Sequence, residues 1–136
     1  MSTQARILSI EDDAEMRSLI QLILERKGHR VIGVKYGEAG LELLRSLKPD
    51  VLLLDLMLPD IDGWEVYRQM KADSELATVP VIIVSARSEK QDAADGFQVL
   101  AHDRYLQKPF QVVDLIDTVY NVLEQYPVSR ENLPLK

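Results

Sequence analysis

The sequence predicts one α/β domain, a parallel sheet with helices on both faces. Short apolar runs alternate with stretches of helical periodicity, and this pair recurs five times along the chain. Such alternation is typical of parallel strands joined by helical crossovers. Residues 51–54 and 81–84 are wholly apolar, as expected for strands buried on both faces. A length of 136 residues fits a single domain.

The strands are expected around Ile7 to Ile10 and at residues 30–34, 51–54, 81–84 and 104–107. Apolar residues at helical spacing predict helices from Met16 to Leu24, Leu41 to Leu47, Trp64 to Met70, Ala93 to Ala101 and Val112 to Leu123. The first helix should end before Gly28, because glycine is favoured just past a helix C-terminus. The fourth, carried by Ala93, Phe97, Leu100 and Ala101, has the least regular pattern.

The amino-acid composition disfavours or excludes several kinds of protein and binding site. The 22 acidic and 16 basic side chains give a net charge of −6, which disfavours direct binding to nucleic acid. The absence of cysteine excludes disulfides and thiolate metal sites. No signal-peptide pattern and no apolar run long enough to span a membrane are found, so a cytoplasmic location is expected. Residues 126–136 carry two prolines and little periodicity, and we interpret them as a tail or truncated linker after a domain at 1–125.

The stretch "DVLLLDLMLPDIDG", residues 50–63, places a carboxylate at the end of a buried strand. A charge there is costly unless something compensates it. Similar polar residues follow other strands: Glu11, Asp12 and Asp13 after the first, Asp55 after the third, Ser85 after the fourth and Lys108 after the fifth. In open α/β sheets, ligands bind beyond the carboxyl ends of the strands, so these side chains should converge.

This set of side chains has a chemical logic. Carboxylates held close together raise one another's pKa, and a divalent cation relieves their repulsion. Oxygen ligands without His or Cys suit Mg²⁺, which takes one or two carboxylates and retains water. With Mg²⁺ and Lys108 neutralising phosphate charge, Asp55 could attack a phosphoryl donor, and Ser85 could donate to the phosphoryl oxygens.

Four motifs, "SIEDDAEMR", "LLLDLMLPDIDG", "VIIVSAR" and "DRYLQKPF", resemble in order and spacing the receiver domain of two-component response regulators, including the chemotaxis-type single-domain receiver. The resemblance covers roughly residues 5 to 125. It implies a flavodoxin-like, doubly wound five-stranded sheet in the order 2-1-3-4-5. It also implies phosphorelay signalling, in which a histidine kinase or phosphotransfer domain phosphorylates the receiver with Mg²⁺ as cofactor. The domain would then act as a switch rather than an enzyme.

The resemblance assigns roles around the phosphoryl group. Asp55 matches the phosphoacceptor, and Lys108 matches the lysine that contacts the phosphoryl group. Ser85 and Tyr105 match the switch pair, in which the hydroxyl moves toward the phosphoryl group and the aromatic ring turns inward. The Lys108–Pro109 bond would be cis, an isomer found in about 5–6% of X–Pro bonds.

The resemblance also implies the metal ligands. Asp12 and Asp55 would bind Mg²⁺ directly, Glu11 through water, and Met57 through its backbone carbonyl. Asp13 falls on a variable position of the family.

Several residues have structural alternatives. Asp12 with Glu15 forms a capping-box pattern before the first helix. Asp55 could begin the turn before Pro59, Ser85 could cap the next helix, Lys108 could be a solvated lysine and Tyr105 an ordinary strand aromatic. We interpret Asp60 and Asp62 as turn residues, His29 and His102 as surface residues, and Trp64 as core or partly exposed near the site.

Two rival functions fit the same fold class. One is a phosphorylation-independent pseudo-receiver that acts as a protein-binding scaffold, although the intact Asp12, Asp55, Ser85 and Lys108 disfavour it. The other is a flavodoxin-like flavin binder, which the acidic loop after the first strand disfavours.

The segment before the fifth strand departs from the family pattern. It reads "AHDRY" where Gly-Ala-Asp-Asp-Tyr is usual, so Ala101, His102 and Arg104 alter the face formed by the fourth helix, fifth strand and fifth helix. That face is the family's usual output surface. The last helix also lacks the basic pattern of regulators that dimerise there. We expect a monomer or weak dimer that binds a downstream protein or output domain through this face.

Overall fold

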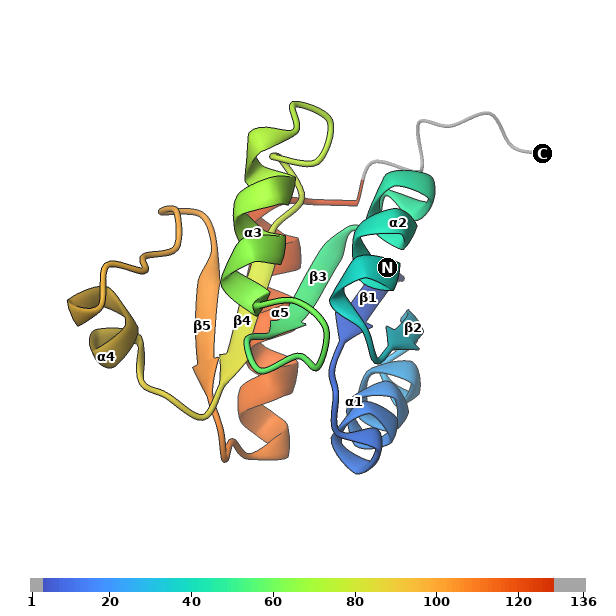
Figure 1. Cartoon of the computed structure of the whole chain (residues 1–136). Coiled ribbons are helices and arrows are strands. Elements are labelled where there is room, and N and C mark those ends of the chain that lie inside the picture. Colours follow the sequence, from blue (N-terminus) through green and yellow to red (C-terminus); the bar gives the residue numbers. More distant parts are fainter. Residues whose placement is uncertain (1–3, 129–136) are drawn as a thin grey trace.

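The computed structural model describes residues 4–128 as a five-stranded sheet between two layers of helices (Figure 1). The strand order is β2-β1-β3-β4-β5, and every neighbouring pair is parallel. The predicted flavodoxin-like class and the order 2-1-3-4-5 are therefore confirmed.

Ten elements alternate along the chain. They are β1 (Arg6–Ile10), α1 (Ala14–Arg26), β2 (Arg30–Val34), α2 (Gly37–Leu47), β3 (Val51–Asp55), α3 (Gly63–Ala72), β4 (Val81–Ser85), α4 (Glu89–Ala94), β5 (Arg104–Gln107) and α5 (Val112–Gln125). All five predicted strands are present. β3 and β4 each run one residue further than predicted, so Asp55 and Ser85 are the last residues of their strands.

Two apolar cores cover the two faces of the sheet. One packs α1 and α5 against alternate strand residues such as Ile7 and Leu53. The other packs α2 and α3 against the intervening residues, such as Leu8 and Leu54. Because β3 contributes to both cores, its residues are buried on both faces, as its unbroken apolar run predicted.

Helix α1 is capped by a different residue than predicted. Asp13, not Asp12, is the N-cap of α1, and its carboxylate accepts from the amides of Glu15 and Met16. The capping-box interpretation of Asp12 is therefore wrong, which leaves the Asp12 side chain available for another role. At the other end of α1, Gly28 has φ +94°, as expected for a glycine just past a helix.

Helix α4 is shorter than its apolar pattern predicted. It covers Glu89–Ala94, and Gly96 follows with φ +92°. Phe97 and Leu100, expected on a buried helical face, lie in the following loop and are 42% and 47% exposed. A left-handed glycine so soon after the helix start prevents the longer helix.

Beyond α5, Tyr126 and Val128 pack against the core formed by α1 and α5. The rest of the predicted tail, residues 129–136, lies outside the described residues. Among residues 4–128, none of the helices has the length and apolar character needed to cross a bilayer.

Candidate functional site

The carboxyl ends of β1, β3, β4 and β5 bring three predicted site residues together. Glu11 directly follows β1, and its amide donates to the carbonyl of Val34 at the end of β2 (3.0 Å). Asp55 ends β3, and Lys108 directly follows β5. The Lys108 amide donates to the Ser85 carbonyl (2.7 Å), which fixes the start of the lysine loop against β4. The topology therefore brings together the side chains at the carboxyl ends of three strands.

Lys108 bridges the two buried carboxylates of this site. Its Nζ lies 3.1 Å from Glu11 Oε1 and 3.4 Å from Asp55 Oδ2. Glu11 is 1% exposed and Asp55 is 5% exposed. Lys108 is therefore not a solvated surface lysine but the cation that compensates buried charge. The bond from Lys108 to Pro109 is cis, the isomer that the family resemblance implied.

One lysine does not neutralise both carboxylates. Burial raises the pKa of Glu11, the hydrogen bond and negative charge of Asp55 also raise it, and Lys108 opposes these shifts, which together bring the pKa to about 7. Oε1 of Glu11 is buried, and its ion-pair partner is the Lys108 ammonium, 3.1 Å away. Two buried carboxylates that share a single lysine form an oxygen-rich site with excess negative charge, and this chemistry fits a hard divalent cation such as Mg²⁺.

Asp12 and Met57 lie next to this pair rather than within it. Together with Leu58, Pro59 and Asp62 they line a shallow hollow at the same edge of the sheet. In residues 4–128, no three His, Cys, Asp or Glu side chains are close enough together to form a ready metal cage. The structure thus unites Glu11, Asp55 and Lys108 and leaves Asp12 at the rim. Mg²⁺ commonly retains several waters, so such a site needs only one or two protein carboxylates.

The β3–α3 loop is shaped by its aspartates. The Asp55 carboxylate accepts from the amide of Met57 (3.0 Å), and Asp62 caps α3 by accepting from the amide of Trp64 (2.9 Å). Asp60 does more than form a turn, because its two oxygens accept from the amides of Gly37 and Glu38 at the start of α2. The β3–α3 loop is thereby attached to a second helix, a contact that no local sequence pattern predicted.

Ser85 and Tyr105 belong to a hydrogen-bonded cluster with α4. Ser85 Oγ accepts from the amide of Arg87 (3.1 Å), whereas α4 is capped by Ser88, so Ser85 is not the helix cap. The Tyr105 hydroxyl donates to the carboxylate of Asp92, which also accepts from Arg87 Nε (2.8 Å).

Tyr105 is consequently more than an ordinary strand aromatic. Burial and the hydrogen bond to Asp92 raise the pKa of Tyr105 to about 12. Asp92 is a buried carboxylate that sequence reasoning missed. It lies outside the predicted apolar face of the fourth helix, so no sequence pattern indicated its burial.

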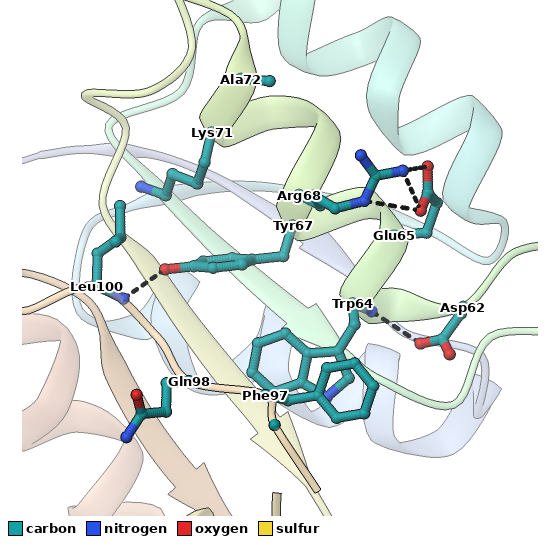
Figure 2. A pocket seen from close by; sticks show the side chains of 11 residues that line it. Asp62, Trp64, Glu65, Tyr67, Arg68, Lys71, Ala72, Phe97, Gln98 and Leu100 are labelled. Carbon is teal, nitrogen blue, oxygen red and sulfur yellow. Dashed lines mark hydrogen bonds and ion pairs between the residues drawn. The ribbon is translucent and has the colours of Figure 1, made fainter. Parts of the chain in front are cut away.

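A second hollow lies between α3 and the loop after α4 (Figure 2). Trp64 and Phe97 stack there with ring centroids 5.2 Å apart, and the Tyr67 hydroxyl accepts from the amide of Leu100 (2.7 Å). Glu11, Asp55, Ser85 and Lys108 are not among its lining residues. Half-buried Trp64 therefore belongs to this hollow and not to the carboxylate site.

The two histidines are half-buried rather than surface residues. His29 Nδ1 accepts from the amide of Ala5 (3.1 Å), and burial lowers the pKa of His29. His102 Nε2 lies 3.3 Å from Lys71 Nζ. Their contacts are structural, and they leave the carboxylate site to Glu11, Asp55 and Lys108.

Known proteins are similar to this chain in sequence and in fold. The family model described as "Response regulator receiver domain" matches residues 7–120. Transcriptional regulatory protein CseB of Streptomyces coelicolor is 40% identical over 126 residues, which cover 93% of this chain and 52% of CseB. Protein PilH of Pseudomonas aeruginosa is 36% identical over 119 residues, covering 88% of this chain and 98% of PilH. The chain thus spans about half the length of CseB but nearly all of PilH.

Solved structures agree with this match. The signal receiver domain of a signal transduction histidine kinase from Syntrophus aciditrophicus has a TM-score of 0.83 at 27% identity, and the match covers 96% of this chain and 98% of that one. The strand order, the convergence of Glu11, Asp55 and Lys108, and the match over residues 7–120 lead to one identification. The chain belongs to the response regulator receiver domain family of two-component systems.

Proposed function

We propose that this receiver takes part in a phosphorelay by accepting a phosphoryl group on Asp55. The observation that carries the proposal is the buried Asp55 carboxylate at the end of β3, 3.4 Å from the Lys108 ammonium. A carboxylate so placed can act as a nucleophile, and the lysine can neutralise an incoming phosphoryl group.

The phosphoryl donor would be a phosphohistidine on a histidine kinase or a phosphotransfer domain. An oxygen of the Asp55 carboxylate attacks phosphorus, and a P–O bond forms as the P–N bond breaks. The imidazole keeps the electron pair of the broken bond and takes a proton from solvent. Asp55 becomes an acyl phosphate. Lys108 shares its charge with the new phosphoryl oxygens, and Ser85 donates its hydroxyl to one of them.

Asp12, Asp55, the Met57 carbonyl and, through water, Glu11 are the groups that would hold Mg²⁺. When bound, Mg²⁺ neutralises negative charge on the carboxylates and the phosphoryl oxygens. The raised pKa of Glu11 and the two buried carboxylates that share one lysine support this assignment.

Phosphorylation would act as a switch through the cluster around Ser85. When Ser85 turns toward the phosphoryl group, Tyr105 exchanges its hydrogen bond with Asp92 for an inward position. Because Asp92 belongs to α4 and Tyr105 to β5, this exchange alters the face formed by α4, β5 and α5.

We propose that this face binds a downstream protein or output domain, without direct contact to nucleic acid, in a domain that is a monomer or weak dimer. The exposed Val112, Val113 and Tyr120 of α5 supply apolar contact area. The domain serves as a switch and catalyses only its own phosphorylation and dephosphorylation. A cytoplasmic location stays a prediction.

The test is the intact mass after incubation with phosphoramidate, a small donor with a P–N bond, with and without Mg²⁺. We expect one phosphoryl adduct on the wild type in Mg²⁺ and none on Asp55→Asn or in excess chelator. Asp62→Asn, which keeps a helix cap in the same loop, is the matched control and should be phosphorylated normally. A folded wild type that gains no phosphoryl group would favour the scaffold function instead.

A further inference from the structure

Arg17 reaches from α1 to the backbone of the acidic loop. Its Nη1 donates to the carbonyl of Glu11 at 2.8 Å and lies 3.4 Å from the carbonyl of Asp12. Hydrogen bonds from a guanidinium to carbonyl oxygens are charge-assisted and stronger than neutral ones. Arg17 therefore fixes the backbone of the two residues whose carboxylates belong to the proposed phosphorylation site.

Gly33 of β2 makes room for this reach. A Cβ atom at position 33 would lie 2.8 Å from Arg17 Cγ and 3.1 Å from Arg17 Cδ. The first distance is shorter than van der Waals contact allows, and Cγ is close to the helix backbone, so the whole arginine stem would have to move. The φ angle of Gly33 is not in the left-handed region, so its backbone does not itself require glycine. The close approach of the Arg17 stem explains why position 33 is a glycine.

The Glu11 backbone is consequently held from two sides. Its amide donates to the carbonyl of Val34 at the end of β2 (3.0 Å), and its carbonyl accepts from Arg17. The amide contact uses the carbonyl of Val34, and the arginine contact depends on the space beside Gly33, the preceding residue of β2. The direction in which the Glu11 and Asp12 side chains leave the sheet is set by this double attachment.

We propose that Arg17, seated in the slot of Gly33, is a positioning residue that orients the acidic loop for Mg²⁺ binding. The proposal rests on the proposed function. Arg17 touches no carboxylate in the described contacts and acts only through the backbone. It resembles the outer groups of metal sites, which orient ligands without binding the ion.

Electrostatics alone predicts the opposite effect. Arg17 carries a positive charge close to a cation site, so its removal should strengthen Mg²⁺ binding if only charge mattered. If Arg17 positions the loop, its removal should weaken Mg²⁺ binding. Whether Mg²⁺ binding becomes weaker or stronger when Arg17 is removed therefore distinguishes a positioning role from a purely electrostatic one.

The experiment measures the Mg²⁺ dissociation constant by titration calorimetry at fixed ionic strength, using the full chain. We expect Arg17→Met to weaken Mg²⁺ binding by on the order of tenfold. Gly33→Ala should weaken it in the same direction, because the added methyl group displaces the arginine stem without any change of charge. In the double variant, Gly33→Ala should have no further effect on Mg²⁺ binding, because the hydrogen bonds from Arg17 to the acidic loop are already absent.

The matched control is Arg26→Met, which removes the same charge from the last turn of α1, far along the helix from the acidic loop. Its Mg²⁺ affinity should equal that of the wild type, and thermal unfolding without metal confirms that each variant is folded. Unchanged or tighter Mg²⁺ binding by Arg17→Met, or additive effects in the double variant, would overturn the inference alone. A wild type that binds no Mg²⁺ would overturn the proposed function and the inference with it.

Discussion

At the scale of single residues, Lys108 is the side chain that compensates the negative charge of the site's buried carboxylates. It lies within 3.4 Å of two carboxylates that are both almost fully buried. Buried carboxylates without a cation are costly, and an arriving phosphoryl group adds further negative charge. Lys108 therefore compensates buried charge in the resting protein, and in the proposed reaction it would also neutralise the transferred group.

Replacement of Lys108 by Met should slow phosphorylation of Asp55 by on the order of 10²-fold, since one charged group that stabilises the transferred phosphoryl oxygens is lost. The rate is measured as adduct formation from phosphoramidate in saturating Mg²⁺. Lys35→Met, an exposed lysine just past β2, is the control and should keep the wild-type rate. Equal rates for the two variants would show that Lys108 does not act on the phosphoryl group.

The sequence predicted Glu11, Asp55, Ser85 and Lys108 because parallel strands carry their carboxyl ends to one edge of the sheet. This rule needs only strand positions, which apolar runs reveal. Asp92 and Arg17 could not be found in this way. Their partners, Tyr105 and the carbonyl of Glu11, come from other elements, and a hydrogen bond across elements leaves no periodic signal.

At the scale of elements, Asp103 ties three segments together just before β5. Its side chain is fully buried and accepts from the Tyr67 hydroxyl (2.6 Å), the Val81 amide (2.8 Å) and Lys71 Nζ (3.1 Å). These donors belong to α3 and to the start of β4. The position of α3, which follows the loop after Asp55, thus depends on one carboxylate at the opposite edge of the sheet.

Asp103→Ala should destabilise the domain by about 3–5 kcal/mol, because it leaves the buried Lys71 ammonium without its counterion and the Tyr67 hydroxyl and Val81 amide without their acceptor. The free energy of unfolding is measured by urea denaturation. Asp117→Ala, an exposed aspartate of α5, should change that free energy by less than about 0.5 kcal/mol. Similar losses for the two variants would contradict the network.

His29 should make the stability depend on pH. Burial lowers its pKa in the folded protein, and its Nδ1 accepts from the Ala5 amide, which requires the neutral ring. As the pH falls below about 6.5, the unfolded chain takes up this proton before the folded protein does. The contribution of His29 to the free energy of unfolding should therefore be lost between pH 7 and pH 5, whereas the raised pKa of Glu11 acts in the opposite direction.

The measurement is urea denaturation at several pH values, with His29→Gln as the comparison, whose side chain retains an acceptor and does not titrate. The slope between pH 7 and pH 5 should be smaller for His29→Gln. An unchanged slope would exclude His29 as a source of the pH dependence.

Elements also show where sequence patterns fail. The five strands lay where predicted because each is a short apolar run inside the sheet. Helix α4 is shorter than predicted. Phe97 and Leu100 were assigned to its buried face, but they lie in the following loop and line the hollow beside α3. An apolar spacing does not distinguish a helix from a loop that contacts a neighbouring aromatic cluster.

At the scale of the whole molecule, the two apolar cores fill both faces of the sheet and leave its carboxyl edge for polar groups. The proposed binding of Mg²⁺ at that edge would therefore be linked to the stability of the entire fold. A ligand that binds only the folded state stabilises it according to its concentration and affinity.

Mg²⁺ at 100 times its dissociation constant should raise the free energy of unfolding by about 2.7 kcal/mol. Asp55→Asn should lose most of this gain, because it removes a direct ligand. Asp13→Asn, which keeps the α1 cap in the same acidic loop, should retain it. Denaturation curves with and without Mg²⁺ provide the measurement, and a gain that persists in Asp55→Asn would place the ion elsewhere.

The central claim is that Asp55 forms the acyl phosphate. The most direct measurement treats the phosphorylated wild type with borohydride, which reduces an aspartyl phosphate to homoserine, and locates the product by peptide mass spectrometry. The account predicts homoserine at position 55 and unmodified Glu11, Asp12 and Asp13. A reduced residue at any of those three positions, or none in a protein that carries the phosphoryl adduct, would contradict it.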